Sequence, residues 1–346
     1  MKPYFINIRD CKINNPLSDV DDVTNFYNAL DEYQPTPLVS MPNLAKKLTI
    51  GSLKIKDESN RLGLNSFKSL GVRYAIHKIL SRSNVSTFCS ATDGNHGKAV
   101  ARICHQMGLS SVIYVPVFTE SNVLLSLEME GAEVIQTDSD YNETCLIASK
   151  ASKKNGWTLI QDTAWLGYEK IPLEIMSGYQ MIMEEIEKQD DTHPDIIFLQ
   201  VGVGSFAASI ASYYIDKPLK PRIVLVEPMA SDGMFQSFIN GKLSLPLRPS
   251  ETLMAGLNCG VPSMIAYDIL KCIADAIMVI DDSQIKKAQT ELASEFSNDP
   301  NVFAGPSGVA GVGGLLAIFD DSFRKLRMEM NISRKSHILC INTEGA

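Results

Sequence analysis

The sequence has no excess of positive charge and no cluster of metal-binding side chains. It holds 32 lysines and arginines against 40 aspartates and glutamates, which gives a net charge of −8. A chain this acidic is not expected to bind nucleic acid or an anionic membrane surface. Its five histidines form no HExxH or similar pattern, so we expect no metal centre.

Long apolar runs and paired cysteines are also missing. The N-terminus lacks the apolar segment of a signal peptide, and no uninterrupted apolar run is long enough to cross a bilayer. The seven cysteines are scattered without a CxxC pair, and this odd count suggests reduced thiols. We therefore expect a cytoplasmic protein that does not associate with membranes.

What the chain does have is a regular alternation of strand-like and helix-like segments. Strands are predicted at residues 87–90, 111–115, 133–136 and 158–161, with a helical segment after each. This order predicts parallel sheets with helices on both faces, the three-layer α/β architecture. The 346 residues exceed one typical core. We expect a larger domain from residues 1–80 and 171–346, with a smaller α/β domain inserted at 81–170.

The stretch NSFKSLG, residues 65–71, opens a predicted helix. Asn65 or Ser66 can cap that helix by accepting a free amide hydrogen bond. Lys68 then lies in the first turn, where the helix dipole disfavours an ammonium group and desolvation disfavours it further. A neutral amine is the form that makes a Schiff base, so Lys68 is a candidate catalytic residue. The alternative is an ordinary solvated lysine.

Gly202-Val203-Gly204-Ser205 lies between a predicted strand at 196–201 and a predicted helix at 207–214. Small residues let the backbone approach a phosphate, and the helix N-terminus supplies amide donors and positive potential. The third glycine of the dinucleotide fingerprint is missing, so a monophosphate fits better than a pyrophosphate. The alternative is a tight turn without a ligand.

The segment ATDGNHG, residues 91–97, is a second loop between a strand and a helix. Its amides could hold a carboxylate, and the side chain of Asn95 could hold a ring hydroxyl. Asp93 is unexpected there because a carboxylate repels a bound anion, and the alternative for it is a helix N-cap. His96 on its own is more typical of a packed supporting residue than of a catalyst.

Two further polar residues follow predicted strands. Asp162 comes after the strand at 158–161, and Thr343 comes after the strand at 338–341. Open α/β sheets bind their ligands at the carboxyl ends of the strands, so both side chains are candidates for a site. The hydroxyl of Thr343 could meet a ring nitrogen. The alternatives are an N-cap for Asp162 and a turn residue for Thr343.

This set of a lysine, a phosphate loop, a carboxylate loop and a hydroxyl resembles the fold type II pyridoxal phosphate (PLP) enzymes, the tryptophan synthase β and threonine dehydratase group. Within it the chain is most similar to the diaminopropionate ammonia-lyases, from about residue 30 to the end. The segments that carry the resemblance are PTPL at 35–38, KDES at 56–59, GLNSFK at 63–68, ATDGNHG at 91–97, QDTAW at 161–165, GVGS at 202–205, MAGLNCG at 254–260 and TEG at 343–345. The aspartate at 93 and the QDTAW segment set this subfamily apart from ordinary threonine or serine dehydratases.

The resemblance implies a role for each candidate residue. Lys68 binds PLP covalently, the loop of Gly202, Val203, Gly204 and Ser205 holds its phosphate, Asn95 contacts the ring hydroxyl and Thr343 faces the pyridine nitrogen. Asp162 and Asp93 are implied as the bases for the L- and D-isomers, whose Cα–H bonds point to opposite faces. The substrate contacts are expected from Ser66, Thr92, Asp93, Gly94, Asn95, His96 and Asp162.

The function implied is β-elimination on 2,3-diaminopropionate, a small amino acid, to give pyruvate and ammonia. The alternatives on the same scaffold are a β-replacement synthase, a serine or threonine dehydratase, and a degenerate PLP-binding subunit. Retention of Lys68, Asp93 and Asp162 argues against the last of these. The resemblance also implies a homodimer.

The sequence departs from the family pattern in two places. Family members usually continue beyond the TEG turn with an acidic segment, whereas this sequence stops at Ala346. We therefore expect a more open site, or one that a partner chain covers. Residues 305–308, GPSG, also lack the glutamate that often lies beside the ring in this fold. Both departures bear on the substrate more than on the cofactor.

Overall fold

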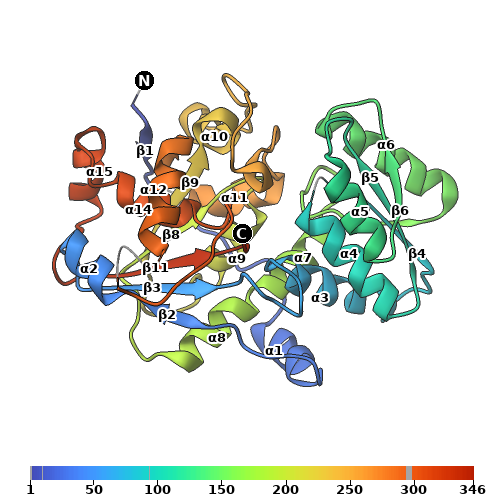
Figure 1. Cartoon of the computed structure of the whole chain (residues 1–346), viewed down its shortest axis with the longest axis horizontal. Coiled ribbons are helices and arrows are strands. Elements are labelled where there is room, and N and C mark those ends of the chain that lie inside the picture. Colours follow the sequence, from blue (N-terminus) through green and yellow to red (C-terminus); the bar gives the residue numbers. More distant parts are fainter. Residues whose placement is uncertain (1, 10, 93, 294–297) are drawn as a thin grey trace.

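Two α/β units, each built around its own sheet, make up the protein (Figure 1). The computed structural model describes residues 2–9, 11–92, 94–293 and 298–346. The larger sheet runs in the order β1-β10-β9-β8-β11-β3-β2, and the smaller in the order β6-β5-β4-β7. The predicted α/β class with parallel sheets is confirmed.

The larger sheet is parallel in its centre and antiparallel at both edges. Its strands are β1 (Tyr4–Ile6), β2 (Leu38–Ser40), β3 (Ser52–Asp57), β8 (Ile196–Gln200), β9 (Arg222–Pro228), β10 (Ala276–Ile280) and β11 (His337–Asn342). β1 pairs antiparallel with β10, and β2 pairs antiparallel with β3. Neither edge strand is predicted from the sequence, because a strand of three residues shows too little alternation to be recognised.

The smaller sheet is parallel throughout. Its strands are β4 (Thr87–Ala91), β5 (Ser110–Val115), β6 (Glu133–Gln136) and β7 (Thr158–Leu159). All four lie where the sequence predicts strands, although β7 ends two residues early. A parallel arrangement brings the loops after β4 and β7 to the same edge of this sheet.

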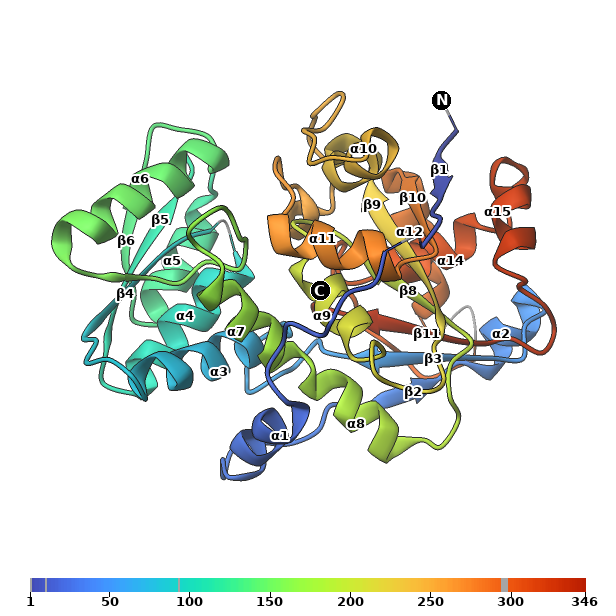
Figure 2. The same ribbon diagram turned by 180° about the vertical axis from the view of Figure 1, so that it is seen from behind.

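Helices cover both faces of each sheet, as Figures 1 and 2 show. They are α1 (Val20–Asn28), α2 (Pro42–Leu48), α3 (Lys68–Leu80), α4 (Asn95–Gln106), α5 (Ser121–Met129), α6 (Tyr141–Asn155), α7 (Lys170–Tyr179), α8 (Met181–Gln189), α9 (Ser205–Ser212), α10 (Gly233–Asn240), α11 (Met264–Ile273), α12 (Asp282–Leu292), α14 (Ala310–Ala317) and α15 (Arg324–Glu329). The helical segment predicted after the strand at 158–161 is two helices, α7 and α8. They part at Gln180, whose amide donates to the carbonyl of Ser177, three residues back.

Alternate residues of the central strands enter two different cores. In β8, Ile197 and Leu199 pack with α7, α9 and α11, whereas Ile196 and Phe198 pack with α12 and α14. The first core continues into the smaller unit through Phe88 of β4. Both faces of the large sheet are therefore buried, which explains why its central strands read as unbroken apolar runs.

Helices α3 and α7 connect the two units. α3 packs against α7 and also against α4 of the smaller unit. The two helices approach so closely that a Cβ at Gly178 of α7 would lie only 2.6 Å from the carbonyl oxygen of Leu70 in α3. Glycine at position 178 therefore allows this packing. Figure 2 shows α7 running from the smaller unit to α8 beside the larger one. The first residue of α3 is Lys68, so this junction supports the candidate lysine.

The predicted cap of α3 is wrong. The N-cap residue is Phe67, and no side chain caps the helix. The residues expected to cap it pair instead with the end of the chain. The amide of Gly345 donates to the carbonyl of Asn65, and Ser66 forms a bridge with Glu344. Tertiary pairing has therefore replaced the local cap.

The expectation that all cysteines are reduced is also wrong. Cys11 and Cys272 form a disulfide between the N-terminal segment and α11. They lie 261 residues apart, so no local spacing motif could reveal the pair. Among the other described cysteines, Cys89, Cys104 and Cys340 are buried thiols.

A buried ion cluster lies beneath the loop that leads to α3. Lys56 and Arg61 both pair with Glu185 of α8, at 2.5 and 2.6 Å, and Arg61 also pairs with Glu58 at 2.7 Å. All four side chains are at most 1% exposed. The KDES segment thus contributes to the fold, and the carbonyl of Arg61 accepts a hydrogen bond from Ser69, the residue after Lys68.

Candidate active site

The candidate residues meet in a cavity of about 260 Å³. It opens where β4, β7, β8 and β11 end, at the carboxyl ends predicted for ligand binding. The predicted residues that line it are Lys68, Thr92, Gly94, Asn95, His96, Asp162, Gly202, Val203, Gly204, Ser205 and Thr343. A larger cavity of about 510 Å³ between the 57–64 loop and α4 contains none of the predicted residues.

One predicted residue, Ser66, stands apart from this wall, and Asp93 is not described. Ser66 is buried in its pairing with Glu344 and does not line the cavity. Asp93 lies outside the described residues, so the prediction for it remains one from sequence. Its neighbour Thr92 shapes the loop, because its hydroxyl accepts hydrogen bonds from the amides of Gly94 and Gly97 at 3.1 and 3.4 Å.

Lys68 forms an ion pair with Asp162. Its ammonium donates to Oδ2 of that carboxylate and lies 5.2 Å from the centre of the Phe67 ring. Burial would lower the pKa of Lys68, but the charge of Asp162 raises that pKa above the ordinary lysine value. The prediction of a neutral amine is therefore wrong for this structure, since the pattern of the first helical turn could not reveal a carboxylate 94 residues away.

Asp162 is fixed by its backbone as well as by Lys68. The hydroxyl of Ser205 donates to the carbonyl of Asp162. Tyr168 closes the turn, because its hydroxyl accepts from the amide of Gln161 and donates to the carbonyl of Leu159, both at 2.9 Å. Burial would raise the pKa of Asp162, but the charge of Lys68 and the proximity of His96 lower it to about 2.

His96 lies beside Asp162 with one ring nitrogen free. Its Nε2 is 3.0 Å from the carbonyl oxygen of Ile160, which can only accept, so Nε2 carries the proton. Its Nδ1 has no hydrogen-bond partner and lies 3.9 Å from Oδ2 of Asp162. Burial lowers the pKa of His96, so the ring is neutral at neutral pH. This placement agrees with the interpretation of His96 as a supporting residue.

The 202–205 loop joins β8 to α9 and requires its glycines. Gly204 has a φ of +97°, a conformation that side chains disfavour, and a Cβ there would lie 2.6 Å from Cε of Met234. A Cβ at Gly202 would lie 3.2 Å from Sγ of Cys259. The loop therefore presents bare backbone and the N-terminus of α9 to the cavity, which is the geometry of an anion site.

Two wall residues, Gln200 and Glu344, are absent from the predictions. Nε2 of Gln200 donates to the hydroxyl of Thr343 at 2.9 Å. Oε2 of Glu344 accepts from Nδ2 of Asn95 at 2.7 Å, and Oε1 accepts from the amide of Ser307 at 2.9 Å. Asn95 opens α4 of the smaller unit, so its bond to Glu344 ties the two units together at the cavity. The sequence signal was present, since Gln200 lies in the strand predicted at 196–201 and Glu344 lies in the TEG segment.

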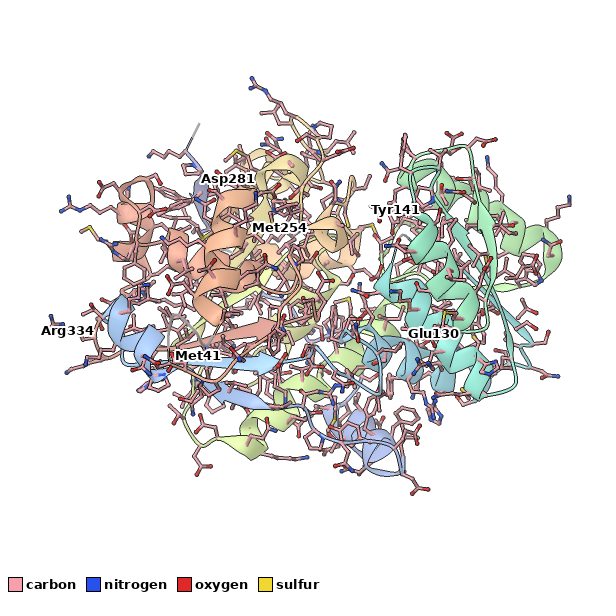
Figure 3. All side chains as sticks on the ribbon, in the orientation of Figure 1. Met41, Glu130, Tyr141, Met254, Asp281 and Arg334 are labelled. Carbon is pink, nitrogen blue, oxygen red and sulfur yellow. A yellow bond between two sulfur atoms is a disulfide. The ribbon has the colours of Figure 1, made fainter. Side chains whose placement is uncertain are left out.

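Tyr141 and Cys259 also line the cavity and were not predicted. Tyr141 begins α6 and lies on the side of the smaller unit that faces the larger unit. Figure 3 labels Tyr141 on the smaller unit and Met254 on the larger unit. The cavity is therefore lined by residues of both units. In the part of the chain that the structure describes, no three metal-ligating side chains come together, and no helix there is long and apolar enough to cross a membrane.

Comparison with known proteins gives matches over almost the whole chain. The model of the family described as "Pyridoxal-phosphate dependent enzyme" matches residues 29–344. Diaminopropionate ammonia-lyase of Salmonella typhimurium is 33% identical over 94% of this chain and 88% of its own length. A Staphylococcus aureus L-threonine dehydratase is 26% identical over 74% of this chain and 71% of its own length.

Solved structures of diaminopropionate ammonia-lyase from Escherichia coli are similar in fold and sequence. The complex with an aminoacrylate–PLP azomethine reaction intermediate has a TM-score of 0.90 and 32% identity, covering 99% of this chain and 94% of that one. The complex with D-serine has a TM-score of 0.91 and 30% identity, covering 99% and 93%.

Proposed function

The chain belongs to the pyridoxal-phosphate dependent enzymes, and on that premise we propose that it is an ammonia-lyase acting on 2,3-diaminopropionate. The products are pyruvate and ammonia. The observation that carries the proposal is the single cavity in which Lys68, Asp162, the 202–205 loop, Asn95 and Thr343 come together. The matches to diaminopropionate ammonia-lyase along nearly all of both chains support the substrate.

The residues of the cavity fit PLP. The positive φ of Gly204 and the close approach of Gly202 to Cys259 both favour glycine, so the loop brings its backbone amides to the cavity in front of α9, where they could hold a phosphate. At the end of β11 the hydroxyl of Thr343 reaches the same cavity, where a ring nitrogen would meet it. Lys68 is 21% exposed and directs its Nζ into the cavity. We propose that Lys68 holds the cofactor, Gly202, Val203, Gly204 and Ser205 its phosphate, Asn95 its hydroxyl and Thr343 its nitrogen.

Asp162 is the proposed base for the L-isomer. When bound, PLP supplies an electron sink for the negative charge that remains after the substrate's Cα loses its proton. Asp162 is 8% exposed and lies within hydrogen-bond distance of the Lys68 amine. The proposed base and the proposed cofactor-binding nitrogen are therefore neighbours in the cavity. Asp93, from the loop after β4, is the proposed base for the opposite face. The β-amine leaves as ammonia, and the released enamine hydrolyses to pyruvate and a second ammonia.

The loop after β4 and the walls beside it are the proposed substrate contacts. Thr92, Gly94 and Asn95 lie at the start of α4, where amides can hold the substrate carboxylate. His96 packs beside Asp162, with Nδ1 3.9 Å from Oδ2, and is proposed to shape the wall next to that carboxylate. Ser66, also predicted as a contact, is proposed to act only through the backbone pairing that places Lys68.

A hydroxy-amino-acid dehydratase is the second candidate. It rests on the threonine dehydratase match, which is lower in identity and shorter than the ammonia-lyase matches. QDTAW and Asp93 favour the ammonia-lyase, because the resemblance to that subfamily rests on these segments. A β-replacement synthase and a degenerate subunit have no such observation in their favour.

The domain division, location and assembly complete the proposal. We propose a large PLP-binding domain of residues 1–80 and 171–346 and a smaller domain of 81–170, in line with the two sheets. We propose a cytoplasmic homodimer, which the family resemblance supports. Light scattering of the purified enzyme tests the assembly, and a fully active monomer would contradict it.

A substrate screen tests the function. The purified enzyme is incubated with L- and D-2,3-diaminopropionate, serine, threonine and O-acetylserine, and pyruvate and ammonia are measured separately. The proposal predicts two ammonia molecules for each pyruvate from 2,3-diaminopropionate, whereas serine can yield only one. Turnover of serine, threonine or O-acetylserine with no turnover of either diaminopropionate isomer would assign the enzyme to the alternatives.

A further inference from the structure

Gln200 is a buried glutamine at the end of β8, and its side chain points toward β11. It is 2% exposed. Its Nε2 lies 2.9 Å from the carbonyl oxygen of Ile341, 2.9 Å from Oγ1 of Thr343 and 3.1 Å from the carbonyl oxygen of Gly308. The Gln200 amide therefore contacts Thr343, the residue at which the ring nitrogen of the cofactor is expected.

The orientation of the Gln200 amide is fixed by its neighbours. Two of the three groups around Nε2 are backbone carbonyls, which can only accept. A flipped amide would place its oxygen against both carbonyl oxygens and leave all of them buried without donors, which is costly. The NH2 group must therefore face Thr343, and Oε1 points the other way, where it has no partner.

This orientation also sets the role of the Thr343 hydroxyl. An amide NH2 has no lone pair to offer, so Thr343 Oγ1 can only accept in its contact with Gln200, which shares its two N–H protons among three acceptors. The hydroxyl proton is then left over, and no other hydrogen bond of Oγ1 exists within the described residues. Because Thr343 lines the cavity, that proton is available to an acceptor there.

We propose that Gln200 is a positioning residue that holds the Thr343 hydroxyl as a hydrogen-bond donor to the pyridine nitrogen of the cofactor. The inference rests on the proposed placement of PLP against Thr343. A ring nitrogen that accepts from a neutral hydroxyl keeps its lone pair and stays unprotonated. The ring then withdraws electrons less strongly than a pyridinium, which favours prompt loss of the β-amine over prolonged charge at Cα.

Nitrogen-15 NMR of the enzyme loaded with ring-labelled PLP tests the inference directly. In the wild type the ring nitrogen should show the shift of an unprotonated, hydrogen-bonded pyridine. Thr343→Val removes the hydroxyl, so the shift should move to that of a free pyridine. Gln200→Met keeps the shape but releases Thr343, so it should move the shift the same way and weaken PLP binding about two- to tenfold.

A double-mutant cycle separates positioning from a general effect on the fold. If Gln200 acts through Thr343, Gln200→Met should produce no further change in the ring shift when Thr343→Val is already present. Gln180→Met is the matched control, because Gln180 is also buried with an unpartnered carbonyl oxygen but does not line the cavity. It should leave the ring shift unchanged.

Gln200→Glu provides a second variant should Gln200→Met fail to fold. When the new carboxyl group is neutral it can donate to Thr343, and the ring shift should match the wild type. When it ionises it accepts the Thr343 proton, and the shift should move to that of Thr343→Val. The ring shift should therefore acquire a pH dependence, and Thr343→Val in the same chain should abolish it.

The outcomes distinguish the inference from the proposal beneath it. A shift that moves in Thr343→Val but in neither Gln200 variant overturns the positioning role alone. A shift that Thr343→Val leaves unchanged overturns the placement of the ring nitrogen. A protonated ring nitrogen in the wild type overturns the assigned direction of the hydrogen bond. None of these results alters the substrate screen, which tests the ammonia-lyase activity separately.

Discussion

The change of Asp162 to asparagine tests the proposed chemistry most directly. Asparagine keeps the shape of the side chain but can neither take up the Cα proton nor balance the charge of Lys68. Burial is then the main remaining influence on the lysine, so the pKa of Lys68 should fall below the ordinary value instead of lying above it. PLP binding should survive, because the lysine and the 202–205 loop are unchanged.

The expected loss follows from the role of a positioned base. Removal of such a base costs ~10²–10⁴ in rate, which corresponds to about 2.7–5.5 kcal/mol of activation free energy. This loss should appear in kcat with L-2,3-diaminopropionate, whose Cα–H faces Asp162 in the proposal. The D-isomer presents its Cα–H to the opposite face, so its turnover should fall much less.

The assay compares kcat/KM for the two isomers by pyruvate release, with the visible spectrum as a check on bound PLP. Asp93→Asn should give the reverse preference, as predicted from sequence. Asp190→Asn is the matched control, because Asp190 is also paired with a lysine, Lys54, but lies outside the cavity. Equal losses on both isomers in Asp162→Asn would refute the face-specific role and point to binding of the substrate's distal ammonium.

Three further changes test the cofactor site and the fold around it. Lys68→Ala should abolish the borohydride-trapped PLP adduct, and an adduct on Lys98 instead would show that the lysine is misassigned. Gly204→Asp should weaken PLP binding at least tenfold, about 1.4 kcal/mol, because its carboxylate repels the phosphate and its side chain clashes with Met234. An unchanged PLP affinity by titration would show that the loop is not part of the site. Glu185→Gln should lower the free energy of unfolding by about 3–5 kcal/mol, because it leaves two buried cations facing one carboxylate. The same change at Glu130, whose ion pair is partly exposed, should lower it by less than about 1 kcal/mol. Equal losses for the two variants in urea titrations would contradict this.

Most residues of the candidate site could be predicted because each follows a strand. Asp162 comes after β7 of the smaller sheet, and Gly202 and Thr343 come after β8 and β11 of the larger sheet. In each sheet the parallel strands bring their carboxyl ends to one edge, and residues from both edges line the cavity. The loop motifs supply the chemistry, and the strand order places it. This is why residues spread over most of the chain were predicted to share a site without knowledge of their contacts.

The partners of those residues could not be predicted, because they depend on side chains distant in sequence. Gln200 reaches Thr343 across 143 positions, and Asn95 reaches Glu344 across 249. No period or spacing encodes such pairs. The same holds for the replaced cap of α3, where pairing with the end of the chain overrides the local preference of Ser66.

The pairing of Lys68 with Asp162 has a consequence for when the base can act. Each group holds the other in its charged form, with the pKa of Asp162 at about 2 and that of Lys68 raised. A carboxylate with so low a pKa is a poor proton acceptor at neutral pH. Once the lysine nitrogen loses its positive charge, burial becomes the main influence on Asp162, and its pKa should rise toward the range of a useful base. The nearby Nδ1 of His96 then offers an acceptor for the proton that Asp162 has taken up. The ion pair therefore links the strength of the proposed base to the charge of the lysine, so that Asp162 becomes basic only while the Lys68 nitrogen is neutral.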